Sequence, residues 1–292
     1  VLYRAHFHAM ELELDLKRQG IPYQIVSGIR FFEQAHIKDV CCVLRMLESP
    51  HDEAAFARLL RLFPGVGEKT PPKLWARLGG RFDPNDGDQR RRLREILPSA
   101  AAGSWETIEP VLKAYREESL NEDAGEVMIR FIDTFYEAYA RRTFEEAEDR
   151  LDDVRELAAY TANFESTESF LSDIALMTNV DAESEEVGSA PKEVLRLSTV
   201  HQAKGLEWAV VFLIWMNDGM FPSSRTLRET WGGESEERRL FYVGVTRAKD
   251  ELNLCVPEIR RGRDGTTNYC RPSRFITEIP PALVQTVRPS FI

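Results

Sequence analysis

Short apolar runs alternate with helical periodicity at both ends of the 292-residue chain. Near the start, the apolar run VLYRAHF is followed by the helical pattern HAMELELDLKRQG, the β-rich run IPYQIVSG and a second helical pattern, AHIKDVCCVLRML. The alternation resumes at Val194 with the runs EVLRLSTV and AVVFLIWM and continues to about Ile279. Strands that alternate with helices predict an α/β domain built on a parallel sheet.

The stretch between these two parts follows a different pattern. Helical periodicity dominates it, as in ETIEPVLKAYREES and AGEVMIRFIDTFYEAYARR, and Pro, Gly and Asp breakers such as LGGRFDPNDGD divide it. We therefore predict a discontinuous α/β domain at residues 1–46 and 190–279, an inserted helical subdomain at 47–189 and a C-terminal tail at 280–292.

The net charge of −10 is unevenly distributed along the chain. Acidic residues strongly outnumber basic ones between Glu95 and Ala190, whereas basic residues are in the majority in the rest of the chain. Because phosphate binding depends on local basic surface, the overall charge does not exclude a nucleic-acid partner.

Cysteine usage and hydropathy indicate a cytoplasmic protein with no membrane segment. The four cysteines show neither metal-ligand spacing nor the framework of a secreted protein, so we expect reduced thiols and no metal ligands. No apolar run reaches the length of a membrane span. The first residue is Val and already reads as strand, so we expect the chain to start in mid-protein, without a signal peptide.

Two motifs carry the strongest chemical signal. The segment TVHQAKGLEW leaves one predicted strand at Thr199 and enters the next, and EERRLFYVGVTRAKDELNL runs along a predicted helix to Arg247 before a further strand. These segments resemble motifs V and VI of the UvrD/Rep-like superfamily 1 DNA helicases. Residues 1–52 resemble motif IV and the segment after it, and GMFPSSRTL and YCRPSRFITEIP also resemble the family. The sequence holds no G-x-x-x-x-G-K-[ST] loop for phosphates and no apolar strand that ends in Asp-Glu for magnesium.

The resemblance implies the C-terminal half of an ATP-dependent DNA helicase. The implied fold is a RecA-like parallel-sheet domain, related to P-loop NTPases but without its own P-loop, interrupted by a mostly α-helical subdomain. The implied activity is translocation on single-stranded DNA, in the 3′ to 5′ direction, with unwinding of duplex in repair or replication. The implied cofactors are ATP and Mg²⁺, and the implied partners are single-stranded DNA, the single/double-strand junction and the missing N-terminal RecA-like domain. Without that domain, we expect the chain alone to be inactive.

The resemblance also assigns a nucleotide site. It implies that Tyr3 stacks on the adenine, that Arg4 reaches the γ-phosphate and that Glu207 binds the ribose. Arg247 resembles an arginine finger, whose charge stabilises the transferring phosphoryl group, and Gly205 allows close backbone approach at the turn. We expect Tyr3, Glu207 and Arg247 to face a common surface. A buried strand-end tyrosine and solvated or ion-paired arginines are the alternatives that the residue types alone leave open.

Three neighbours of Arg247 have expected roles of their own. Gly244 lies three residues before it on nearly the same helical face, where a missing side chain would let another surface approach. Arg238 and Arg239 are expected to be structural or to form ion pairs.

The resemblance places DNA contacts in two parts of the chain. Thr199 and His201 are implied to touch the single-stranded backbone, and Lys204 is open between a phosphate contact and an ion pair. In the helical block, the turn PGVGEKT can expose backbone N–H groups to duplex phosphates, although a plain turn is the alternative. The remaining predicted DNA contacts are Gly65, Gly67, Lys69, Thr70 and Arg263.

Two other functions fit the same residues. One is a non-catalytic helicase-like module that binds DNA or a repair partner. The other is the helicase part of a recombination helicase–nuclease.

Overall fold

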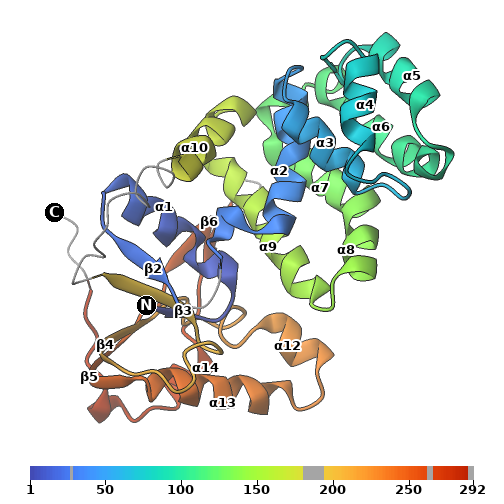
Figure 1. Ribbon diagram of the computed structural model, residues 1–292. Helices are drawn as coiled ribbons and strands as arrows, with labels where there is room; N and C mark the ends of the chain where they lie inside the picture. Colours follow the sequence, from blue (N-terminus) through green and yellow to red (C-terminus); the bar gives the residue numbers. More distant parts are fainter. Residues whose placement is uncertain (27–28, 180–193, 262–265, 289–292) are drawn as a thin grey trace. The chain divides into compact units, whose positions relative to one another are not determined.

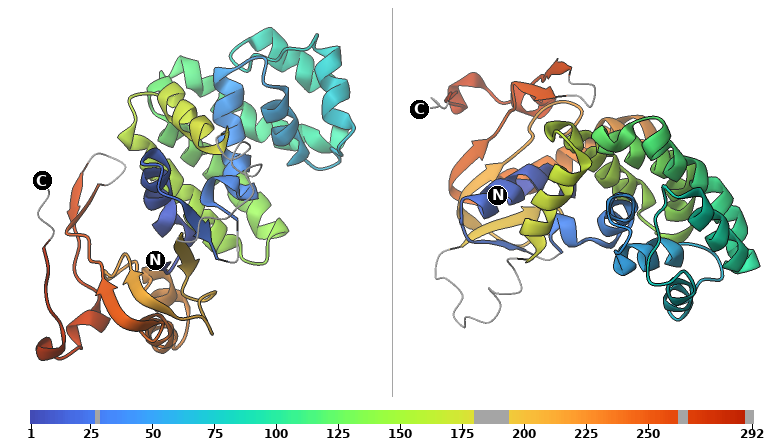
Figure 2. Two further views of the ribbon diagram at one scale, coloured as in Figure 1. Left: turned by 60° about the vertical axis from the view of Figure 1, so that its left-hand side comes forward. Right: turned by 90° about the horizontal axis from the view of Figure 1, so that it is seen from above.

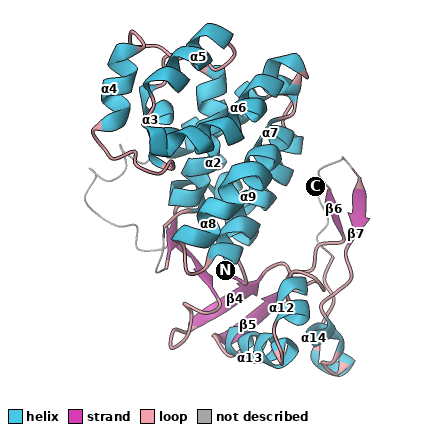
Figure 3. Cartoon of the chain, turned by 90° about the vertical axis from the view of Figure 1, so that its right-hand side faces the viewer, coloured by secondary structure: helices cyan, strands magenta, loops and turns pink. Residues whose placement is uncertain are grey.

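The computed structural model describes residues 1–26, 29–179, 194–261 and 266–288 and divides into two compact units. The first, called here the sheet unit, consists of Val1–Gly28, Ala190–Gly262 and Thr266–Ile292. The second, called the helical unit, consists mainly of Ile29–Ser189. Figure 3 shows that the strands belong to one unit and that the other is built from helices.

Five parallel strands form the sheet of the first unit. They are β1 (Leu2–Tyr3), β2 (Tyr23–Ile25), β3 (Leu195–Thr199), β4 (Trp208–Leu213) and β5 (Ala248–Leu254). Their order across the sheet is β2-β3-β1-β4-β5, and every paired neighbour is parallel. The strands before and after the helical unit therefore complete one sheet.

Successive side chains of a strand point to opposite faces of the sheet. Apolar side chains are buried on both faces here, and helices cover each face. Leu2 joins a buried cluster with Val211 and Leu213 on the face of α13 (Gly233–Val245). Tyr3 instead packs with Leu197 and Leu16 on the face of α1 (Met10–Arg18). Figures 1 and 2 show α1 and α13 on the two sides of the sheet.

Shorter elements complete the sheet unit. They are the 3-10 helices η1 (His6–Ala9) and η7 (Pro281–Leu283), the helices α12 (Ser224–Glu229) and α14 (Arg274–Thr277), and the antiparallel hairpin β6 (Ile259–Arg261) and β7 (Thr267–Tyr269).

In the helical unit, α2 packs against α3, α7 and α9 (Figure 3). Its α-helices are α2 (Ala35–Glu48), α3 (Glu53–Arg61), α4 (Thr70–Arg77), α5 (Gly87–Ile96), α6 (Ala102–Glu117), α7 (Ala124–Phe131), α8 (Glu137–Thr143), α9 (Ala147–Tyr160) and α10 (Thr167–Asn179). A π-helical turn, η5 (Ile132–Tyr136), joins α7 to α8, and the short 3-10 turns are η2 (Phe31–Glu33), η3 (Ser99–Ala101), η4 (Leu120–Glu122) and η6 (Thr161–Asn163).

Paired polar groups lie inside the helical unit. The Tyr136 hydroxyl donates to Asp39 Oδ2 at 3.0 Å, and His36 Nε2 lies 3.0 Å from Asp153 Oδ2. Buried polar groups cost stability unless they are hydrogen-bonded, so these pairs are consistent with a specific helical core.

The α/β fold with a parallel sheet, predicted from the alternating pattern, is confirmed. The division between the units differs from the predicted ranges, because residues 29–46 pack with the helices rather than with the sheet. The physical reason is that α2, predicted as part of the α/β domain, buries both its apolar face and Asp39 among helices. None of the helices in the described part is both long and apolar enough to cross a lipid bilayer.

Candidate functional site

The residue after β1, Arg4, is held by a buried carboxylate. Its Nε and Nη2 atoms donate to Glu237 Oε1 at 2.9 and 2.8 Å, and Nη2 lies 3.5 Å from Thr226 Oγ1. Glu237 is 1% exposed on α13, and its second oxygen accepts the backbone N–H of Ser223 at 3.1 Å. The Arg4 side chain keeps 16% of its surface exposed.

Arg247 lies in the turn between α13 and β5, with all three guanidinium nitrogens oriented. Nε donates to Val243 O at 2.9 Å, Nη1 to Leu206 O at 3.0 Å and Nη2 to Thr246 Oγ1 at 2.9 Å. Each Nη carries two hydrogens, so two of the five N–H donors stay available to a ligand. These acceptors are all neutral, and the side chain is half-buried.

The loop before β4 lies beside Arg247. Glu207 is exposed, and its Oε2 is 3.6 Å from Lys249 Nζ on β5. Gly205 adopts φ +86, a left-handed conformation that favours glycine, and a side chain there would meet open space. The close approach predicted for Gly205 is therefore sterically open, and the loop brings Glu207 and Arg247 to one edge of the sheet.

Tyr3 does not offer a platform for stacking. Its side chain is 1% exposed and packs with Ala9, Leu16 and Leu197 under α1. The adenine-stacking role of Tyr3 stays a prediction that its burial does not favour, because strand alternation turns the ring into the core while Arg4 turns toward α13.

The expected common surface for Tyr3, Glu207 and Arg247 is also not found. Leu2 pairs with Leu213, so β1 ends level with the end of β4, whereas Glu207 directly precedes β4. Six strand residues separate these levels, which corresponds to about 20 Å along the sheet. Arg4 therefore lies near the carboxyl edge of the sheet, and Glu207 and Arg247 lie at the amino edge of β4 and β5.

The residues predicted to touch single-stranded DNA follow β3. Thr199 is 6% exposed, and its Oγ1 accepts the Gln202 N–H at 3.3 Å, so its hydroxyl is already used in the turn. His201 and Lys204 are exposed. The loop that begins with Thr199 ends at Glu207, so the exposed basic side chains and the carboxylate share one segment of chain.

The GVG turn of the helical unit is exposed at Gly65, Gly67 and Lys69. The Thr70 N–H donates to Gly67 O at 3.0 Å, and two prolines without N–H groups follow Thr70 in the first turn of α4. The start of α4 therefore has few free N–H groups for a phosphate. Any backbone phosphate contact at this turn would depend on N–H groups before Thr70, such as that of Gly67. Arg263 lies outside the described residues.

Two predictions about the α13 helix have clear outcomes. A side chain at Gly244 would lie 3.3 Å from Leu213 Cδ2, so this glycine lets α13 approach its own sheet rather than another surface. Arg238 forms ion pairs with Glu234 and Glu278, which confirms the structural role predicted for it. Arg239 is exposed.

Neither Glu237 nor Thr226 was predicted as a site residue, although the position of Glu237 on its helix could have indicated one. It lies three residues before Leu240 and seven before Gly244, on the buried stripe of α13. A carboxylate in an apolar stripe indicates a buried partner of opposite charge, and here that partner is Arg4.

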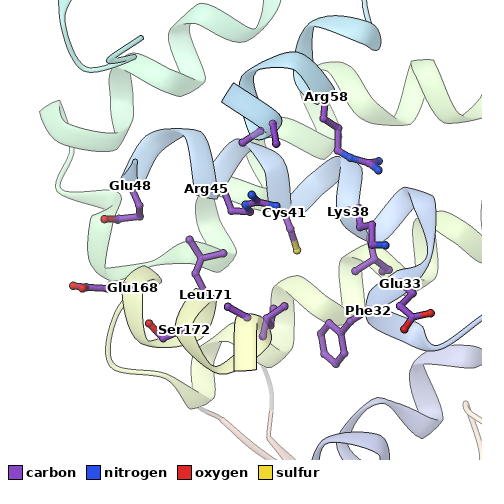
Figure 4. A pocket seen from close by; sticks show the side chains of 15 residues that line it. Phe32, Glu33, Lys38, Cys41, Arg45, Glu48, Arg58, Glu168, Leu171 and Ser172 are labelled. Atoms are coloured by element: carbon purple, nitrogen blue, oxygen red, sulfur yellow. The ribbon is translucent and has the colours of Figure 1, made fainter. Parts of the chain in front are cut away.

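A groove of about 780 Å³ lies in the helical unit between α2, α3 and α10 (Figure 4). Its basic side chains include Arg45 and Arg58, which pair with Asp52 and Asp39 at 2.7 and 2.5 Å. Burial raises the pKa of the Cys41 thiol in this groove to about 12, so it is not a reactive thiolate. Because its charges are largely compensated, we assign no ligand to this groove. Among the described residues, no group of three His, Cys, Asp or Glu side chains is arranged to hold a metal.

Comparison with known proteins agrees with the motifs. The family described as UvrD-like helicase C-terminal domain matches residues 1–258. The chain is 33% identical to the ATP-dependent DNA helicase PcrA of Bacillus subtilis (strain 168) over 299 residues, which cover 98% of this chain and 40% of that protein. It is 34% identical to DNA helicase II of Escherichia coli (strain K12) over 298 residues, 99% of this chain and 41% of that protein. The chain thus spans about 40% of the length of these relatives.

Proposed function

The chain belongs to the family of UvrD-like helicase C-terminal domains, and from this membership we propose that it is one half of an ATP-driven DNA helicase motor. A second RecA-like domain would supply the phosphate-binding loop and close on the sheet unit around ATP. Closure and reopening would move the loop after β3 along single-stranded DNA, in the 3′ to 5′ direction, and separate the strands of a duplex. The names of the relatives, which are ATP-dependent or DNA helicases, support this proposal.

The observation that carries the proposal is the state of Arg247. Its guanidinium is held by Val243 O, Leu206 O and Thr246 Oγ1, none of which is charged. The cation is therefore oriented without being neutralised. A phosphoryl group in transfer spreads negative charge over its oxygens, and an oriented arginine stabilises that charge.

We assign the other residues of the sheet unit around this cation. Glu207 would accept a ribose hydroxyl, and Gly205 would let the nucleotide approach the backbone of the same loop. Arg4 lies at the carboxyl edge of the sheet, away from Glu207 and Arg247, so we do not assign it to the phosphates of this nucleotide. His201, Lys204 and Thr199 would contact the DNA backbone, with the two exposed basic side chains closest to solvent.

The described residues offer contacts for ATP but no group of ligands for Mg²⁺. The guanidinium group of Arg247 and the accessible loop at Gly205 fit the phosphates and sugar of ATP. The described residues contain no acidic cluster suited to Mg²⁺, so we propose that its ligands belong to the other RecA-like domain. Lys69, Gly65, Gly67 and Thr70 would reach duplex DNA at the junction. The four free cysteines are consistent with a cytoplasmic location.

Two observations favour a second candidate function, a non-catalytic module that binds DNA or a repair partner. Tyr3 is buried and Arg4 is paired with Glu237, so two of the predicted nucleotide contacts are engaged within the chain. The intact, uncompensated Arg247 supports the motor instead.

The test is performed on the full-length gene product. ATP hydrolysis is measured with and without single-stranded DNA, and strand displacement is measured on duplexes with a 3′ or a 5′ single-stranded tail. The motor predicts hydrolysis stimulated by single-stranded DNA and displacement from the 3′ tail. DNA binding without hydrolysis would favour the non-catalytic module.

A further inference from the structure

Trp215, two residues after β4, has a backbone conformation that tryptophan rarely adopts. Its φ is 58°, in the left-handed region that favours glycine. A bulky side chain in this region costs free energy, and such strain persists where the surrounding structure enforces it, often at ligand sites. Trp215 is only half-buried, so a place in the centre of the core does not account for the cost.

The indole ring of Trp215 is held by the segment that follows β1. Its Nε1–H donates to the backbone oxygen of His8 at 2.9 Å, and the centroids of the two rings lie 5.8 Å apart with their planes tilted by 31°. Among the described residues, no other aromatic ring contacts Trp215. The ring is therefore anchored along its polar edge, and this anchor does not depend on a ligand.

The contact with His8 carries a second cost. The His8 side chain is 3% exposed, and neither of its ring nitrogens has a hydrogen-bond partner among the described residues. An apolar side chain would fill the same place without leaving two polar atoms unsatisfied. Burial lowers the pKa of His8 to about 3, so the ring is neutral at pH 7 and does not itself attract a phosphate. Two unfavourable features meet at one aromatic contact, which indicates that the contact serves a ligand rather than the stability of the fold.

The register of the sheet places Trp215 at the same edge as the predicted DNA contacts. Leu2 on β1 is level with Ser198 on β3 and with Leu213 on β4. Thr199 and Trp215 lie one and two residues beyond this level, at the carboxyl edge. Because β1 alone separates β3 from β4, the ends of these two strands are about 10 Å apart. A single strand that runs from the loop after β3 across the end of β1 would meet the indole.

We propose that Trp215 is a further DNA-binding residue whose indole stacks on a base of the bound single strand, an inference that rests on the proposed motor function. Every base has a flat aromatic face, so this contact tolerates any sequence, as a translocating motor requires. The indole N–H is already used by His8, so the side chain offers the base its ring and no hydrogen bond.

The experiment measures binding of the full-length gene product to single-stranded DNA by fluorescence anisotropy, without nucleotide. Two ligands of equal length are compared, an oligothymidylate and a strand that has the same phosphates but abasic sites. The variants are Trp215→Leu and Trp215→Phe. The matched control is Trp208→Leu, because Trp208 is a half-buried tryptophan at the other end of β4. Thermal unfolding of each variant records any structural cost.

Trp215→Leu should weaken binding of the oligothymidylate by about 5- to 100-fold, the range that stacking of a base on an aromatic side chain gives. Trp215→Phe should keep most of the affinity, and Trp208→Leu should match the wild type. The abasic strand should bind the wild type and Trp215→Leu equally, since only a base contact is removed. The dependence of affinity on salt concentration should also be unchanged in Trp215→Leu, because no phosphate contact is lost.

Several results would overturn the inference. They are unchanged affinity of Trp215→Leu for the oligothymidylate, an equally large loss on the abasic strand, a weaker salt dependence, or a loss in Trp215→Phe as large as that in Trp215→Leu. If Trp215→Leu does not fold, Trp215→Gly adopts the same backbone without strain, and its loss of affinity must likewise be confined to the oligothymidylate. A wild-type protein that binds neither strand, or that hydrolyses no ATP in the presence of single-stranded DNA, would instead refute the proposed motor function itself.

Discussion

Replacement of Arg247 by Ala should separate its catalytic role from its structural one. In the full-length protein, we expect kcat for ATP hydrolysis to fall by ~10³-fold or more, which corresponds to ~4 kcal/mol of lost transition-state stabilisation. ATP binding should stay within about tenfold, because an arginine finger acts mainly on charge that develops during the reaction.

The structure also predicts a cost in stability. The substitution removes three hydrogen bonds, to Val243 O, Leu206 O and Thr246 Oγ1. A hydrogen bond contributes about 0.5–1.5 kcal/mol net, but water can replace the donor at a half-buried site, so we expect a loss of ~1–2 kcal/mol. Since this loss is much smaller than the stability of a typical domain, the variant should fold.

Two measurements distinguish these effects. Urea unfolding of the chain gives the stability change, and steady-state hydrolysis by the full-length protein gives kcat and KM. Arg239→Ala is the matched control, because Arg239 is an exposed arginine on the same helix. The reasoning fails if Arg247→Ala raises KM but spares kcat, since Arg247 would then be a binding or structural residue. It also fails if Arg239→Ala lowers kcat equally.

Three further outcomes are expected. The isolated chain should show no ATP hydrolysis with or without DNA, because its sequence has no phosphate-binding loop; turnover above that of an Arg247→Ala preparation would contradict this. Tyr3→Ala should destabilise the chain by ~3–5 kcal/mol in calorimetric unfolding, because the ring is part of the core; weaker ATP binding at unchanged stability would instead restore the stacking role. Burial, followed by the charges of Arg4 and Arg260, lowers the pKa of His8 to about 3. Stability that is fully present above the unfolded pKa of about 6.5 should therefore be lost as pH falls toward 3, by up to ~1.4 kcal/mol per pH unit. Urea unfolding at pH 7 and pH 5 should show a smaller difference in His8→Leu, and an unchanged difference would refute the assignment.

Most of the sheet could be predicted from the sequence, because a buried strand shows as a short apolar run of neighbouring residues. The apolar run AVVFLIWM supplies most of β4, and the segment after Arg247 becomes β5, as predicted. The boundary after Gly28 was missed because the pattern of α2 is apolar and helical in either unit. Only its packing partners, which lie far along the chain, decide where it belongs.

The site was harder to predict because motif spacing does not give the direction of a side chain. Arg4 and Tyr3 are adjacent in the sequence, yet they point to opposite faces of the sheet. The resemblance assigned both to one ligand, whereas Tyr3 packs under α1 and Arg4 pairs with Glu237 on α13. The partner of Arg4, Glu237, lies 233 positions away in the sequence, and no local pattern connects the two.

The two arginines differ in a way that bears on how the motor would divide its work. Arg4 is paired with a buried carboxylate, which compensates its charge, whereas Arg247 is held only by two carbonyl oxygens and a hydroxyl. A compensated guanidinium adds little electrostatic attraction but keeps a fixed geometry, which suits recognition of a phosphate oxygen. An uncompensated guanidinium retains its full charge, which suits stabilisation of the transition state. Their protein contacts on α13, at Glu237 and Val243, are six residues apart, or about 9 Å along the helix axis. Because α13 runs from the carboxyl edge of the sheet, where Arg4 lies, to the amino edge, where Arg247 lies, its length keeps the compensated cation away from the catalytic one.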